Sequence, residues 1–99
     1  AFFQDVDLLL IPAQYAASPT TATMATLGQD ENALSMLLRF TAPFDMTGSP
    51  TITLPGGFTD KGLPVAFQLV SRHMEEDLLL RAGHAFQLAT DWHKRRPPV

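Results

Sequence analysis

The sequence of 99 residues contains no cysteine, which excludes disulfide bonds, thiolate metal ligands and cysteine nucleophiles. Charge is also scarce, because acidic and basic residues make up 17% of the chain and leave a net charge of −3. The only basic cluster is Lys94 to Arg96, so the chain lacks the basic face of a nucleic-acid-binding protein. The longest apolar stretch, Leu8 to Ala13, is too short to span a membrane. We expect neither nucleic acid nor a membrane as a partner.

The composition nevertheless indicates a folded chain. Hydrophobic residues make up 45% of it, unlike a disordered protein, and its length allows at most one domain. A body this small leaves much of its surface in water, and so few charges would cover that surface thinly. Either an oligomer or partner hides apolar area, or the chain belongs to something larger, and composition does not separate the two. No signal peptide is recognisable, which favours the cytoplasm.

Three segments are predicted as strands. Val6 to Ile11 and Leu63 to Val70 are apolar at nearly every position, a pattern typical of strands buried on both faces of a sheet. A shorter β-branched run, Thr51 to Leu54, should end at Pro55, and Gly56-Gly57 then opens a tight connection.

Two helices are predicted, and together with the strands they give the α/β class. Glu31 to Phe40 follows Asp30, a good N-cap. The last helix begins with the acidic residues Glu75 to Asp77 and extends toward the basic cluster. Its expected apolar stripe consists of Leu78, Ala82, Ala85, Phe86 and Ala89. The uncharged stretch from Ala13 to Thr26 is expected to be a long irregular loop, as are residues 41–50.

No candidate for catalysis forms a recognisable constellation. His73, His84 and His93 lack metal-binding spacing, and His84 and His93 would point to opposite sides of the last helix. Asp5 and Asp7 share a face at strand spacing, although such residues are usually solvated. We therefore predict no metal site and no cofactor.

Two further features could carry chemistry, and each has a structural alternative. Ser49 stands in no nucleophile motif and is more typical of a turn residue before Pro50. Gly56-Gly57 could present two backbone N–H groups to an anion, but glycine pairs mostly mark tight turns.

An ordered set of motifs resembles the C-terminal end of the amidase signature family. The motifs are D-L-L-L-I-P from Asp7, F-D-M-T-G-S-P-T-I-T-L-P-G-G-F from Phe44, G-L-P-V-A-F-Q-L-V from Gly62 and E-E-D-L-L-L-R-A-G-H-A-F-Q from Glu75. Each is weak alone, but they follow one another in the family's order and cover essentially the whole chain.

The resemblance implies a fold and a reaction. Family members hydrolyse carboxylic amides, or transfer the amide nitrogen, on a mixed β-sheet wrapped by helices. Their serine nucleophile, a second serine in a cis peptide and a lysine belong to earlier parts of a longer chain. Lys61 and Lys94 do not match that lysine, so we assign no catalytic residue here and leave the substrate-binding residues unknown.

Four positions depart from the family's pattern. Asp45 replaces an asparagine, Ala66 replaces a glycine, and Gly56 stands where many members have cysteine. Leu38 stands where subunits that release ammonia from glutamine for transfer-RNA amidation carry an aspartate. The loss of that carboxylate favours a more apolar amide over free glutamine.

The leading hypothesis is therefore that residues 1–99 form one segment, roughly the last fifth of an amidase, inactive alone. It would supply sheet core and one wall of the substrate site, with the Ala13–Thr26 loop as the best candidate for that wall. Its partners would be the rest of the amidase, or another copy bound through open sheet edges, and a small-molecule amide. A non-catalytic accessory module derived from this fold is the alternative, and a small catalytic protein using Asp5 and Asp7 or Ser49 ranks last.

Overall fold

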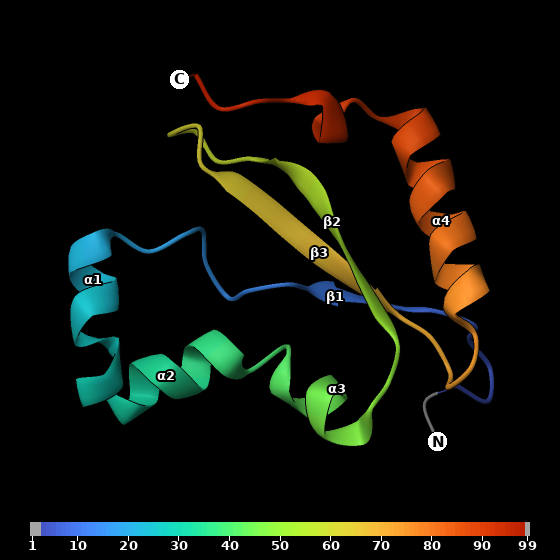
Figure 1. The fold of residues 1–99 in the computed structure, drawn as a ribbon, viewed down its shortest axis with the longest axis horizontal. Coiled ribbons are helices and arrows are strands. Elements are labelled where there is room, and N and C mark those ends of the chain that lie inside the picture. The colour runs from blue at the N-terminus through green and yellow to red at the C-terminus, as the bar shows by residue number, and fades with distance from the viewer. Residues whose placement is uncertain (1–2, 99) are drawn as a thin grey trace.

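The computed structural model describes residues 3–98 (Figure 1). In chain order its elements are β1 (Leu9–Pro12), α1 (Thr21–Thr26), η1 (Leu27–Gln29), α2 (Glu31–Leu38), α3 (Ala42–Thr47), β2 (Thr51–Phe58), β3 (Pro64–Val70), α4 (Glu76–Ala89) and η2 (Trp92–Lys94). The predicted α/β class is confirmed. Its three strands and two predicted helices are present within this part of the chain, together with the additional short helices α1 and α3.

The strands form one sheet in the order β1-β3-β2, with both pairings antiparallel. β3 is therefore central, as its apolar sequence predicts, but the burial on both faces predicted for the first strand was wrong, because β1 lies at an edge of the described sheet and Leu10 is exposed. A turn at Asp60 to Gly62 joins β2 to β3, and Gly62 adopts the positive φ of 77° that such a turn requires of one residue.

Two predicted strand boundaries were wrong. β1 begins at Leu9 rather than Val6, because the carbonyl groups of Phe3 and Val6 accept hydrogen bonds from Arg72. β2 does not end at Pro55 but continues to Phe58. Because β2 lies at an edge of the described sheet, a proline there removes no donor that the sheet needs.

The predicted tight connection at Gly56-Gly57 is instead a bulge within β2. The register to β3 shifts between Pro55 and Gly57, so Gly56 is the extra residue. A Cβ on Gly56 would lie 3.1 Å from the Phe67 ring, which explains why the bulge uses glycine here.

α4 covers one face of the sheet (Figure 1). Its Leu79 packs with Leu54 of β2 and Leu69 of β3 in the buried core. The buried stripe of α4 is centred on Leu79 and Gly83, so the predicted stripe was wrong at Ala85 and Ala89, which are exposed. The helix also ends at Ala89, earlier than predicted, because Thr90 adopts an extended conformation.

The helices α1, α2 and α3 lie on the opposite side of the sheet from α4 (Figure 1). α2 is capped as predicted, since the Asp30 carboxylate accepts hydrogen bonds from the backbone N–H groups of Asn32 and Ala33 at 3.0 and 3.2 Å. The expected loop from Ala13 to Thr26 instead ends in α1, whose N-cap Thr20 accepts a hydrogen bond from the Thr23 N–H. α3 also occupies part of the region expected to be irregular.

No helix in residues 3–98 is both long enough and apolar enough to cross a membrane.

Candidate functional site

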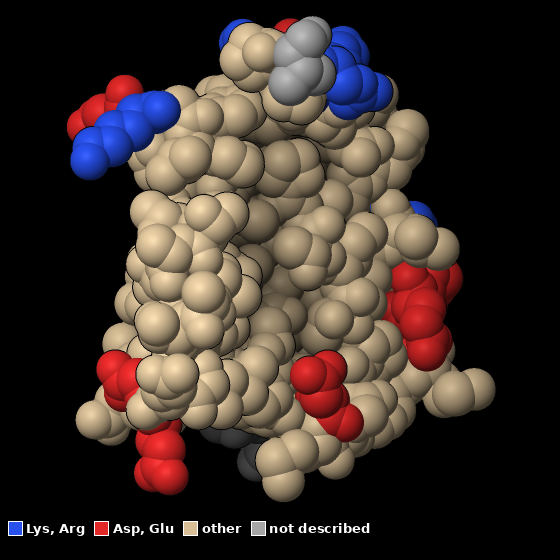
Figure 2. All heavy atoms as spheres, turned by 60° about the vertical axis from the view of Figure 1, so that its left-hand side comes forward, with Lys and Arg blue, Asp and Glu red and all other residues tan. Residues whose placement is uncertain are grey.

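A groove of about 740 Å³ opens where β1 ends and β3 begins. Its lining comes from the segment after β1, the facing parts of β2 and β3, and the residue before α3. The lining residues are Pro12, Ala13, Gln14, Tyr15, Ala16, Ala17, Ser18, Thr41, Thr53, Leu54, Pro55, Pro64, Val65 and Ala66. None of them is charged. Figure 2 shows a hollow in the molecule with uncharged residues around it and charged ones toward the periphery.

The chain forms this groove because β1 stops at a proline and leaves the sheet. The Ala13 N–H still bonds to the Ala66 carbonyl at 3.2 Å, and Ala13 is buried. The segment Gln14–Ser18 then runs free of regular structure until α1 begins. Small side chains and the absence of charge keep the space beside it open and its surface neutral.

The groove offers neutral hydrogen-bonding groups among apolar ones. Gln14 carries an amide, Tyr15 a phenol, and Ser18, Thr41 and Thr53 carry hydroxyls. Such a surface suits a neutral ligand with one or a few polar atoms. It contains no charged acid or base, so its own side chains can bind and orient a ligand but do not form a paired nucleophile and base.

Gln68 fixes the side of the groove that carries Thr41. Its side chain is 3% exposed, and its Nε2 donates to the Phe40 carbonyl at 2.6 Å. This bond ties the link between α2 and α3 to the central strand. In the sequence, Gln68 stands out only as the polar exception in an apolar strand, and its partner Phe40 cannot be predicted from that position.

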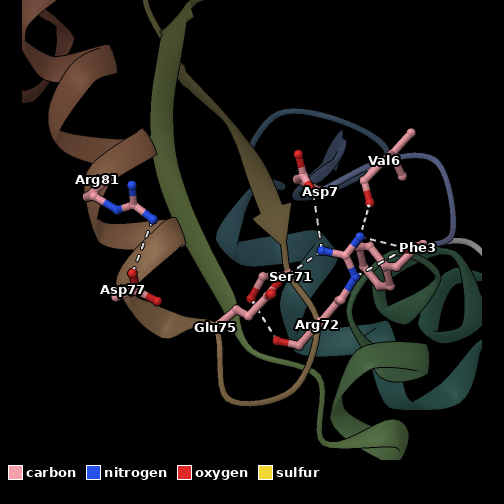
Figure 3. Close-up of polar contacts among 8 residues, drawn as sticks. All are labelled: Phe3, Val6, Asp7, Ser71, Arg72, Glu75, Asp77 and Arg81. Carbon is pink, nitrogen blue, oxygen red and sulfur yellow. Dashed lines mark hydrogen bonds and ion pairs between the residues drawn. The ribbon is translucent and has the colours of Figure 1, made fainter.

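Arg72 anchors the chain before β1 (Figure 3). Its guanidinium donates to the carbonyls of Phe3 and Val6 and forms ion pairs with Asp7 at 3.2 Å and Glu75 at 3.3 Å. The hydrogen bond to Asp7 is the main cause that raises the Arg72 pKa above its ordinary value, opposed by partial burial. The guanidinium stays charged and holds the segment before β1 in place. This role of Arg72 was not predicted from the sequence.

The structure does not bring the acidic candidates together as a catalytic pair. Asp5 and Asp7 precede β1 in an irregular segment, so their expected strand spacing was wrong. Asp7 is exposed and bound to Arg72.

The candidate Ser49 follows the C-terminal end of α3 and has a structural partner there. The Ser49 hydroxyl lies 2.8 Å from the Thr47 hydroxyl. Gly48 ends α3 with a φ of 65°, and the next N–H bonds back to the Phe44 carbonyl at 3.0 Å. This is the glycine-terminated helix end that a side chain would strain.

The histidines lie on separate elements. His73 precedes α4, His84 lies on α4, and His93 lies on η2, so the prediction of one helix for His84 and His93 was wrong. In residues 3–98 no three His, Asp or Glu side chains gather as a metal site would need. Beside His93, Lys94 donates a hydrogen bond that lowers the pKa of Asp91 and closes η2.

The positions that depart from the family's pattern lie in different places. Ala66 lines the groove, whereas Asp45 is exposed on α3 and Gly56 forms the bulge of β2. Leu38 ends α2, and its carbonyl accepts a hydrogen bond from the N–H of Thr41, which lines the groove.

Comparison with known proteins decides the family. The family model described as Amidase matches residues 1–80. The chain belongs to the amidase family.

Relatives of this amidase segment match nearly all of it. A putative amidase AmiD of Mycobacterium tuberculosis is 52% identical over 98% of the chain, and a glutamyl-tRNA(Gln) amidotransferase subunit from Synechococcus is 44% identical over 98%. The solved structure of 6-aminohexanoate cyclic dimer hydrolase superposes with a TM-score of 0.79 at 31% identity over 93% of the chain. The amidase segment spans only 20%, 18% and 21% of these three proteins.

Proposed function

We propose that residues 1–99 are the C-terminal part of an amidase that hydrolyses non-peptide carboxylic amides. In this proposal the segment supplies sheet core and part of the substrate-site wall, and the serine, cis-serine and lysine machinery lies outside it. The complete enzyme acts in the cytoplasm on a small molecule. The observation that carries the proposal is the uncharged groove beside Gln14–Ser18, in a chain that belongs to the amidase family.

The lining of the groove supports a neutral amide as the substrate. An amide needs a donor and an acceptor, and Gln14 and the hydroxyls of Thr41 and Thr53 offer both. Free glutamine also carries two charges, for which the groove has no counterion. Leu38 adds no carboxylate beside Thr41, which also favours an apolar amide over glutamine. Turnover of glutamine by the complete enzyme at the rate of its best amide would contradict this preference.

Substitution of Thr53 by tryptophan tests whether the groove holds the substrate. Thr53 is exposed on β2 and lines the groove, so the T53W side chain would fill part of it. In the complete enzyme, we expect kcat/KM for benzamide to fall roughly tenfold or more, with a smaller loss for acetamide.

Thr51 provides the matched control. It lies two residues earlier on the same strand and face, is exposed, and does not line the groove. T51W should retain both activities. Equal losses in the two variants would contradict a binding role for the groove, and a complete gene product without amidase activity would instead favour the accessory-module alternative.

A further inference from the structure

The segment Gln14–Ala17 has a cavity on each of its two sides. One is the groove, and the other is a small pocket of about 40 Å³. The small pocket is closed from behind by residues of the chain leading to α1, of α1 itself, of η1 and of α2. These residues are Pro19, Thr23, Leu27, Ala33 and Leu37. The segment is therefore a thin wall between the groove and this small pocket.

The small pocket leaves unfilled space behind the wall. It has about the volume that one water molecule occupies in the liquid. Pro19, Leu27, Ala33 and Leu37 contribute apolar side chains to its lining, and Gln14, Tyr15 and Thr23 contribute polar ones. Protein atoms do not fill this space, so a small backward shift of the wall is opposed only where it meets the residues on the far side of the pocket.

The wall is also weakly tethered. Among the described residues, hydrogen bonds hold its two flanks, at Ala13 and at Thr20, but none joins Gln14–Ala17 to another part of the chain. Ala33 and Leu37 of α2 line the small pocket opposite the wall, one turn apart. These two residues therefore limit how far the wall can shift back.

We propose that Ala33 and Leu37 are specificity-determining residues that act through the wall: the volume they occupy sets how far Gln14–Ala17 can recede, and hence how bulky a substrate the groove accepts. This rests on the proposed function of the groove. Neither residue lines the groove, so each is a positioning residue and not a catalytic one. A larger side chain at 33 holds the wall forward, and a smaller one at 37 lets it recede.

Two substitutions test the proposal in the complete enzyme, one that adds side-chain volume at the small pocket and one that removes it. Acetamide and benzamide are the probes. A33L fills the pocket, and we expect the benzamide-to-acetamide ratio of kcat/KM to fall at least about threefold, mainly through the KM for benzamide. L37A enlarges the pocket, and we expect the ratio to rise. A85L places the same new side chain on the exposed face of α4 and should leave the ratio at the wild-type value.

The outcomes separate this inference from the proposed function. If T53W changes the benzamide-to-acetamide ratio while A33L and L37A do not, the groove binds substrate and the positioning role is wrong. If neither T53W nor A33L changes it, the groove itself is not the substrate site. Should L37A fail to fold, A33L alone decides, because a fall in kcat for both amides without a change in their ratio indicates a merely structural role.

Discussion

Gly83 shows how a single residue sets the distance between α4 and the sheet. It is buried, and a Cβ placed on it would lie 3.0 Å from Ile52 Cδ1 and 3.6 Å from a methyl carbon of Leu54. Real Cβ atoms rarely approach so closely, so the helix packs on β2 at a distance that only glycine permits without adjustment. Glycine in a helix usually costs about 1 kcal/mol in stability, and this close contact compensates for that cost.

We expect G83V to destabilise the protein by about 1–3 kcal/mol, because its branched side chain would overpack Ile52 and Leu54. G83A should be nearly neutral, since a small shift of the flexible Ile52 end offsets the gain in helix propensity. Thermal unfolding of the complete enzyme measures both. A Cβ on Gly28 of η1 would meet no heavy atom within 4 Å, so G28V is the control, and an equal loss in G28V would show that the close approach is unimportant.

At the scale of elements, the sequence predicts the helices and strands whose signals come from residues close together in the chain. Asp30 caps α2 through its own side chain, and the long apolar run of β3 indicates a central strand. α1 and α3 were missed because each has only six residues and no apolar stripe. Their ends depend on a threonine cap and on Gly48, signals that also occur in turns.

In the candidate site, too, the features with local sequence signals could be predicted and the others could not. The lack of charge from Ala13 onward predicts a neutral wall, and the part up to Ser18 lines the groove. Thr41 and the tethers Gln68 and Arg72 could not be predicted from local sequence. The backbone carbonyls that Gln68 and Arg72 bind lie 28 or more residues away in the chain, so only the folded arrangement brings them together.

The tether from Gln68 to the α2–α3 link is testable as an element-scale contact. Q68L removes the donor and leaves the Phe40 carbonyl without the partner it has at 2.6 Å. We expect a loss of about 1–3 kcal/mol in stability and a higher KM for amide substrate, because Thr41 is no longer held at the groove. Thermal unfolding and steady-state kinetics of the complete enzyme measure the two effects, and an unchanged melting temperature would show that the tether is dispensable.

At the scale of the whole molecule, the chain exposes more surface than a self-contained domain. Its accessible area is 7414 Å², whereas a compact monomer of this mass has about 5,600 Å². Its radius of gyration is 15.3 Å, against about 12.6 Å for a compact domain of this length. Large apolar side chains are correspondingly exposed, among them Leu10 at 64% and Leu88 at 76%. This open shape agrees with the low charge of the sequence. Both observations support the interpretation that residues 1–99 are a segment that packs against further protein.

The two outer strands differ in how well they resist pairing with another chain. β2 carries Pro55 and a bulge, and both disfavour edge pairing. β1 has four residues and presents Leu10 on its exposed side. Within the described part of the chain its outer edge has no strand beside it, so β1 is the edge where a neighbouring strand would add.

We therefore expect the isolated 99-residue chain to be marginally stable and to associate through β1. Sedimentation velocity should show oligomers or aggregates that grow with concentration. L10K places a charge at this edge and should reduce the association, whereas L88K, which changes an exposed leucine on α4, should reduce it less. A monomeric chain that melts cooperatively at a temperature independent of concentration would contradict the expectation, because it would show that these residues already form a complete core.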